Sequence, residues 1–142
     1  EDMLHPGPPH SSDEERTVVE QLQAGHRAYV ESYKRNAKLM LLLEQVAAID
    51  ANFRRLRLDR ARAFAERNCR WIQKLQDEGY VDPSLDPLMS ARALSAMVGR
   101  MAYFKYAVEE PGWGSDELIV ETATKLWINA LGIPTDGSRR KQ

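Results

Sequence analysis

The sequence predicts an all-α fold, an antiparallel bundle of about five main helices. Apolar residues recur at three- and four-residue steps along most of the chain, which is the period of amphipathic helices. Turn-forming Asp, Pro and Gly residues divide this pattern into five segments of helical length. No alternation of apolar and polar residues is long enough to predict a strand, and the sequence has no internal repeat.

One domain is expected, over residues 12–133. The chain has 142 residues, 43% hydrophobic and 29% charged, which is the size and composition of a single soluble globular domain. The Pro- and Gly-rich residues 1–11 are expected to form a disordered linker, and residues 134–142 a disordered basic tail. A first residue other than methionine fits a piece of a longer protein.

The first helix is expected to begin near residue 13. Ser11 and Ser12 are each followed three residues later by a glutamate, so they offer a capping box in either of two registers. The apolar stripe of this helix encloses His26 and consists of Val18, Val19, Leu22, Tyr29, Val30 and Tyr33.

The second helix, over residues 36–49, is apolar on nearly every side after its first turn. Such a helix is expected in the middle of a bundle. Asp50 is expected to end it and to cap a third helix over residues 52–77, which Gly79 ends. The apolar set of the third helix is Phe53, Leu56, Phe64, Trp71, Ile72 and Leu75.

The fourth helix, over residues 88–108, is apolar around its whole circumference. One face carries the large residues Leu94, Met97, Met101, Phe104 and Val108, and small residues lie roughly opposite. The large face suits a core or a pocket, whereas the small face lets another helix come close. The last helix, over residues 116–131, is expected to be capped by Ser115 and ended by Gly132.

The surplus apolar surface of the last two helices predicts self-association. A single small domain seldom needs two apolar faces on one helix, so a second copy of the chain is expected to cover one of them. The alternative is that both helices pack only within their own domain. The expected homodimer interface comprises Ala91, Ser95, Gly99, Ala102, Tyr106, Ile119, Ala123, Leu126, Trp127 and Ala130.

Inward residues of several helices are candidates for the lining of a ligand pocket. Methionine and aromatic side chains give adaptable apolar walls, while a histidine, an asparagine and tyrosine hydroxyls can orient a polar group. The alternative is that most of these residues, His26 included, are ordinary core. The candidate ligand-binding residues are His26, Tyr29, Tyr33, Met40, Phe64, Asn68, Trp71, Met97, Met101 and Phe104.

The charge and cysteine content favour a cytoplasmic protein without a membrane segment. A net charge of −1 lacks the basic excess that nucleic acid or an anionic membrane would require. The longest apolar run, residues 39–43, is far shorter than the roughly 20 residues of a membrane span, and no secretory leader opens the chain. Cys69 is the only cysteine, so no intramolecular disulfide can form.

The arginine-rich run in the third helix is expected to be a solvated surface, because its residues spread around the helix with Asp59 and Glu66 among them. A contact of some of them with a further domain, or with an acidic group of a ligand, is the alternative. The run consists of Arg54, Arg55, Arg57, Arg60, Arg62, Arg67 and Arg70.

No pattern in the chain indicates catalysis. The sequence has no Gly-rich phosphate loop, no paired-histidine metal spacing, and no Ser-His-Asp or Cys-His arrangement beyond chance. Cys69, close to Trp71 in a helix, is expected to be inert packing. We therefore expect no catalytic residue, no metal and no cofactor.

Several segments resemble the C-terminal regulatory domain of TetR-family bacterial transcriptional repressors, in particular of actinobacterial members. The resemblance extends over about Ser12 to Ile133. The segments that carry it are Tyr33–Met40, Leu43–Ala47, Gly79–Pro83, Leu85–Pro87, Ala91–Ala93, Met97–Tyr103 and Thr124–Gly132.

This resemblance implies a homodimeric regulator whose last two long helices form a four-helix dimer interface and whose internal cavity accepts a small apolar or amphipathic effector. The three-helix DNA-binding head of the family has no counterpart in these residues, so operator DNA is expected to bind only through an N-terminal domain outside them. The alternatives are a structural homodimerisation module without an effector and, less favoured, a small helical enzyme.

Overall fold

The computed structural model describes residues 16–141. In this range it contains α-helices, one π-helical turn and no strand, which confirms the all-α class. The elements are α1 (Val18–Arg35), α2 (Ala37–Ala47), α3 (Ala51–Asp77), α4 (Pro87–Ala102), the π-helical turn η3 (Tyr103–Ala107) and α5 (Asp116–Leu131). The expected linker over residues 1–11 and the expected caps Ser11 and Ser12 lie outside the described residues.

The helix starts follow from capping side chains. Thr17 and Glu20 form a reciprocal capping box, so α1 begins at Val18 and the expected start near residue 13 is wrong. In the sequence, this Thr-x-x-Glu pair begins directly before Val18, the first residue of the apolar stripe. The expected caps Asp50 of α3 and Ser115 of α5 are confirmed, because each side chain accepts backbone N–H groups of the first turn.

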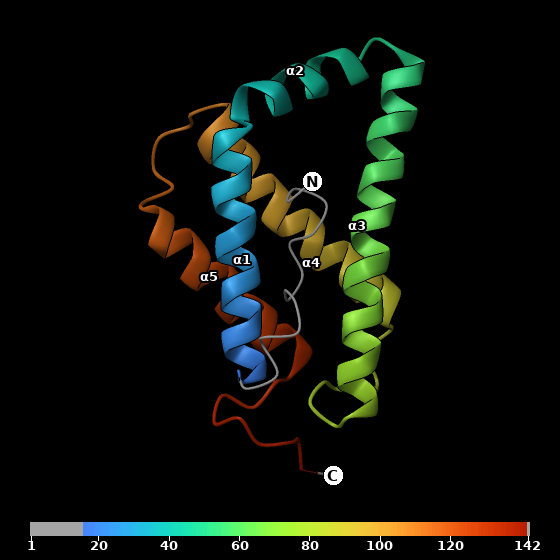
Figure 1. The fold of residues 1–142 in the computed structure, drawn as a ribbon, viewed down its shortest axis with the longest axis vertical. Coiled ribbons are helices and arrows are strands. Elements are labelled where there is room, and N and C mark those ends of the chain that lie inside the picture. Colours follow the sequence, from blue (N-terminus) through green and yellow to red (C-terminus); the bar gives the residue numbers. More distant parts are fainter. Residues whose placement is uncertain (1–15, 142) are drawn as a thin grey trace.

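The helices form two layers (Figure 1). α1 and α3 run antiparallel in the front layer, and α4 and α5 cross behind them. The principal packing is between the layers, α3 on α4 and α1 on α5, while α2 bridges the ends of α1 and α3. Side chains rather than closely packed backbones therefore span the space between α1 and α3.

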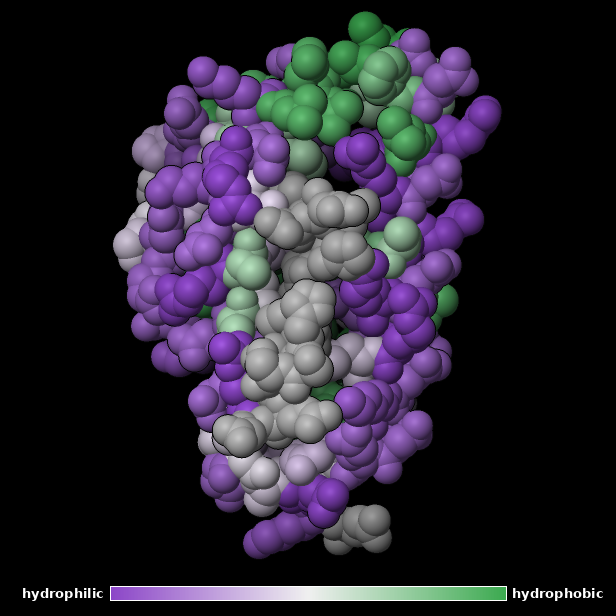
Figure 2. Space-filling view, viewed as in Figure 1, coloured by the Kyte–Doolittle hydropathy of each residue, from purple (hydrophilic) through white to green (hydrophobic). Residues whose placement is uncertain are grey.

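The expected place of α2 in the middle of the bundle is wrong. Ala47 is its only buried residue, Leu39 and Leu42 are more than half exposed, and Ile49 just beyond it is 87% exposed. Figure 2 shows the resulting hydrophobic area at the end of the molecule formed by α2 and the start of α3. Because α2 lies across the helix ends, only one of its sides has a neighbour.

The start of α3 carries the arginine-rich run, which is mostly exposed as expected. Two of its members hold α2 in place. Arg54 Nε donates to the carbonyl of Ala47 at 3.1 Å, and Arg57 Nε donates to Glu44 at 2.8 Å. Arg67 is half-buried.

The C-terminal segment, expected to be a disordered tail over residues 134–142, makes hydrogen bonds to the domain through two of its residues. Arg139 Nε donates to the carbonyl of Glu78 at 2.8 Å, and Arg140 donates to the carbonyls of Gly79 and Gly132 at 2.9 and 2.6 Å. These carbonyls lie at the ends of α3 and α5, where unpaired oxygens and the helix dipole attract cations.

Candidate functional site

An aromatic cluster occupies the space between α1, α3 and α5. Tyr29 of α1 stacks on Phe64 of α3, with centroids 5.7 Å apart and rings nearly parallel. Trp71 lies 6.4 Å from Trp127 of α5, whose indole packs edge to face on His26 at 5.1 Å. We call His26, Tyr29, Tyr33, Phe64, Trp71 and Trp127 the aromatic cluster.

Helical spacing explains how two sequence segments supply most of this cluster. His26, Tyr29 and Tyr33 are three and four residues apart and share one face of α1. Phe64, Asn68 and Trp71 follow a similar spacing on α3. The two faces meet across the space between α1 and α3, so the sequence alone predicts each row but not their meeting.

Two buried polar pairs border the cluster. His26 Nδ1 lies 2.9 Å from Thr124 Oγ1, and Asn68 Nδ2 donates to Ser95 Oγ at 2.7 Å. Two nitrogens, His26 Nε2 and Trp127 Nε1, are buried without a hydrogen-bond partner. An unpaired buried polar atom costs about 1–3 kcal/mol, so these atoms mark a place where the folded chain has an unmet hydrogen-bonding need.

The cluster is uncharged at neutral pH. Burial lowers the pKa of His26 to about 4, so its imidazole is neutral. Burial also raises the pKa of Tyr29 and of Tyr33 well above the ordinary value, so both phenols keep their protons. The site therefore offers neutral donors and acceptors within apolar walls.

α4 contributes Ser95, Met97 and Gly99 beneath the cluster. Ser95 is buried and Met97 packs against both hydrophobic cores of the domain. A Cβ at Gly99 would lie 3.5 Å from the hydroxyl oxygen of Tyr29. The missing side chain therefore leaves α4 close to the tyrosine.

Most candidate ligand-binding residues come together in this region. His26, Tyr29, Tyr33 and Asn68 are buried there, and Met40, Phe64, Trp71 and Met97 pack around the same core. Met101 belongs instead to a second core cluster with Val30, Ile119 and Val120. Phe104 stacks on Trp113 at 6.1 Å, outside the aromatic cluster. Ligand binding by any of them stays a prediction.

Three polar residues of the site were not among the candidates. Thr124 and Ser95 each form one of the buried hydrogen bonds, and Trp127 carries an unpaired nitrogen. The sequence assigned Ser95 and Trp127 to the dimer interface. The sequence does not show which faces of α4 and α5 turn inward, so it could not place Thr124, Ser95 and Trp127 in this site.

The small-residue face of α4 is turned into the domain, so the expected interface residues do not form an exposed surface. Within the chain, Leu126 and Ala130 are exposed and Gly99 and Tyr106 are half-buried. The chain's own helices already bury Ala91, Ser95, Ala102, Ile119, Ala123 and Trp127. A homodimer through these residues stays a prediction, and of them only Leu126 and Ala130 are exposed within the chain.

Other positions of α4, and two positions of α5 that include Leu126, expose large apolar side chains. Leu88 and Met89 of α4 are 42% and 64% exposed, and Leu118 and Leu126 of α5 are 51% and 44% exposed. We call Leu88, Met89, Leu118 and Leu126 the outer apolar residues.

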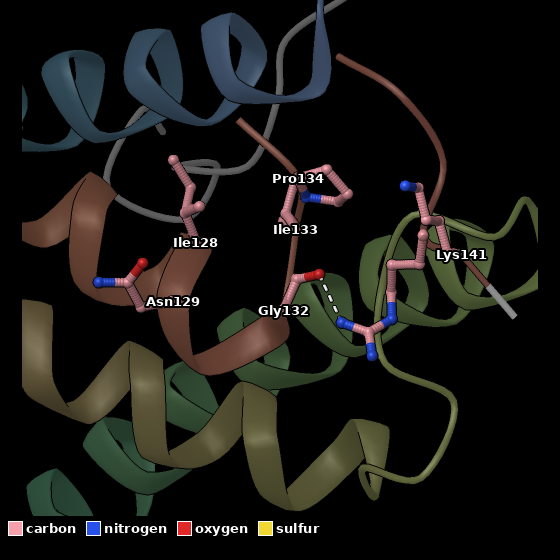
Figure 3. A pocket seen from close by; sticks show the side chains of 7 residues that line it. Ile128, Asn129, Gly132, Ile133, Pro134 and Lys141 are labelled. Carbon is pink, nitrogen blue, oxygen red and sulfur yellow. Dashed lines mark hydrogen bonds between the residues drawn. The ribbon is translucent and has the colours of Figure 1, made fainter. Parts of the chain in front are cut away.

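Two hollows open at the surface away from the aromatic cluster. One, of about 440 Å³, lies where α5 meets the C-terminal segment, and its lining includes Ile128, Pro134 and Lys141 (Figure 3). Arg140 also lines it and donates a hydrogen bond to the carbonyl of Gly132. The other, of about 430 Å³, lies between α1 and α5 and is lined largely by charged residues that include Arg27, Lys34 and Asp116.

Within residues 16–141, no three His, Cys, Asp or Glu side chains gather as a metal site would require. Cys69 is buried as expected, and burial raises the pKa of its thiol. None of the helices in the described range has the length and apolar character needed to cross a bilayer.

Comparisons of this chain with models of protein families, with curated proteins and with solved structures found no match.

Proposed function

We propose that this chain is the effector-sensing and dimerisation domain of a TetR-like bacterial transcriptional regulator. In this proposal a small, largely apolar molecule binds in the aromatic cluster, and a helix-turn-helix outside this chain binds operator DNA. Support comes from the order of the helices, the resemblance of the segments in the sequence, and the chemistry of the cluster.

The observation that carries the proposal is the pair of unpartnered nitrogens inside the aromatic cluster. A core that serves stability alone gains nothing from burying His26 Nε2 and Trp127 Nε1 without partners. Their surroundings are apolar and aromatic, as in sites that bury a small molecule and orient it by a few polar groups.

A ligand between α1 and α3 would act by changing how these helices sit relative to each other. Effector binding alters operator affinity only to the extent that it favours one arrangement of the domain over another. Because α1 and α3 are joined by side chains across the cluster, a molecule inserted there has a direct influence on their separation.

We further propose that the outer apolar residues are covered in a homodimer. Leu88, Met89, Leu118 and Leu126 lie on the last two long helices, which supply the dimer interface in the family that the sequence resembles. This surface also suits a dimerisation module without an effector, which is the second candidate function.

Thermal unfolding with a panel of small apolar molecules tests the effector proposal. We expect at least one of 1-octanol, 4-propylphenol and indole to raise Tm. A ligand concentration of 100 times Kd should raise the free energy of unfolding by about 2.7 kcal/mol. For a domain of this size that is about 5–10 °C. No shift with any compound, together with a stable dimer, would favour the dimerisation module.

Two matched phenylalanine variants locate the binding. Phe64→Ala removes the ring that stacks on Tyr29, and we expect it to reduce the ligand-induced shift by more than half. Phe104→Ala removes a half-buried ring outside the cluster and should leave the shift unchanged. Equal losses in both variants would place the molecule elsewhere.

A further inference from the structure

We infer that the molecule bound in the aromatic cluster is an electrically neutral phenol, whose hydroxyl pairs with both His26 Nε2 and Trp127 Nε1. This inference rests on the proposed function, because it assumes that the cluster opens to a ligand. It adds the chemical class of that ligand.

The hydrogen-bonding needs of the two nitrogens favour a hydroxyl group. Trp127 Nε1 is a donor only, so its partner must accept. His26 Nε2 is an acceptor if Nδ1 donates to Thr124, and a donor in the other tautomer. A hydroxyl can accept from the indole and, in either tautomer, also pair with the imidazole, whereas a carbonyl oxygen can pair with both only in the tautomer whose Nε2 carries the proton.

Among residues 16–141, no charged side chain pairs with the two nitrogens, which argues for a neutral ligand. The two buried polar pairs that border the cluster, His26 with Thr124 and Asn68 with Ser95, are neutral. The guanidinium of Arg100 lies over the rings of Tyr103 and Phe104, 4.7 and 5.1 Å from their centroids. The charge of Glu44 raises the pKa of Tyr33, and the charge of Arg100 lowers it. A carboxylate or ammonium group placed at His26 and Trp127 would thus lose hydration without gaining a partner of opposite charge there.

The shape and exposure of the cluster favour an aromatic body. Tyr29 and Phe64 stack directly on each other between α1 and α3, with ring centroids 5.7 Å apart, so a ring of the ligand could take the place of one of them in such a stack. Phe64 and Trp71 on α3 are only half-buried, while His26 and Tyr29 on α1 are buried. Rotation of the two α3 side chains would therefore admit a flat molecule towards the nitrogens, with ring faces on either side of it.

Calorimetric titration with three matched probes at pH 7.5 tests the inference. The probes are 4-propylphenol, 4-propylbenzoate and propylbenzene, which share an apolar body and differ in the polar group. We expect the phenol to bind about tenfold more tightly than the hydrocarbon, since one net hydrogen bond to a buried group is of this size. The benzoate should bind more weakly than either.

Two variants show whether the indole nitrogen makes the difference. Trp127→Phe removes the buried N–H, and we expect the phenol to lose most of its tenfold advantage while propylbenzene binds as before. Trp113→Phe removes an indole outside the cluster and should change neither affinity. If Trp127→Phe does not fold, the ¹⁵N chemical shift of His26 Nε2 in the wild-type protein tests the contact with the other nitrogen, since bound phenol should move it.

The outcomes separate this inference from the proposed function. Tight binding of the benzoate, an undiminished phenol advantage in Trp127→Phe, or an unmoved Nε2 shift in the phenol complex would each overturn the inference. In these cases a ligand still binds and the effector proposal stands. If none of the three probes binds, the effector proposal itself is contradicted, and the inference with it.

Discussion

The imidazole of His26 packs edge to face against the indole of Trp127, with ring centroids 5.1 Å apart. The same imidazole is paired with Thr124, one helical turn before Trp127 on α5, at 2.9 Å. One side chain of α1 is therefore fixed to α5 by two contacts. Both contacts lie in the middle of the candidate ligand site, so stability and ligand recognition depend on the same residues.

The hydrogen bond between His26 and Thr124 should contribute measurably to stability. Thr124→Val keeps the shape of the side chain but leaves His26 Nδ1 as a further unpartnered nitrogen. We expect the free energy of unfolding to fall by about 1–3 kcal/mol in urea denaturation. Thr122→Val, at a half-buried position of the same helix, is the control. An equal effect of both substitutions would mean that the hydrogen bond contributes nothing.

Burial of His26 predicts a stability that depends on pH. The pKa of His26 is lowered to about 4, below its ordinary 6.5, so the unfolded chain binds a proton that the folded domain does not. Unfolding free energy should therefore fall by up to about 3 kcal/mol as pH falls from 6.5 to 4, and be unaffected by this group above 6.5.

Urea denaturation between pH 7 and pH 5 measures this dependence, because the lowered carboxylate pKa values act only at more acidic pH. We expect His26→Gln to lose the slope in this interval. A wild-type slope that persists in the variant would show that another group causes it.

Asp116 links three elements at the start of α5. Its carboxylate accepts from the hydroxyl of Tyr106 at 2.6 Å and from Lys34 Nζ at 2.9 Å, and these hydrogen bonds lower its pKa to about 2. The stabilisation is present above an ordinary carboxyl pKa of about 4 and is lost as pH falls towards 2. The side chain is 46% exposed, so we expect Asp116→Asn to cost at most about 1 kcal/mol at pH 7.

The acid limb of the stability curve distinguishes Asp116 from other carboxylates. Asp116→Asn should make unfolding free energy less dependent on pH between 4 and 2. Asp77→Asn, at an exposed position at the end of α3, should leave the wild-type dependence intact. The two curves would coincide if the hydrogen bonds to Tyr106 and Lys34 did not stabilise the charged form.

The outer apolar residues predict where a dimer forms. Leu126→Glu places a charge on the exposed surface of α5, and we expect it to convert a dimer to a monomer in sedimentation velocity without loss of helical circular dichroism. Leu42→Glu, on the exposed side of α2, should leave the dimer intact. A dimer that survives Leu126→Glu would assign the interface to another surface.

Gly99→Arg is expected to unfold the domain, because that position faces Tyr29.

The sequence predicts local features of this fold well, because they depend on neighbouring residues. Asp50 and Ser115 cap their helices as expected, and Gly132 ends α5 in the left-handed conformation with φ of 69°. The rows of polar and aromatic residues on α1 and α3 were also predictable, since each row lies on one face of one helix. The exact start of α1 was not, because two further Ser-x-x-Glu pairs precede the Thr17 capping box in the sequence.

Features that depend on a partner element were not predictable. Small residues on α4 indicated a close neighbour, but the sequence does not say whether that neighbour is in the same chain. The Asn68–Ser95 bond shows that α3 fills this place. The apolar residues of α2 likewise indicated burial, yet α2 lies across the helix ends and leaves Leu42 exposed.

The most direct test of a ligand site in the aromatic cluster is tryptophan fluorescence of the Trp113→Phe variant. This substitution leaves Trp71 and Trp127 as the only indoles, and both lie in the cluster. Titration with 4-propylphenol should change their emission along a saturable curve with one transition. Emission that stays constant, or changes only in linear proportion to added phenol, would contradict a binding site between α1, α3 and α5.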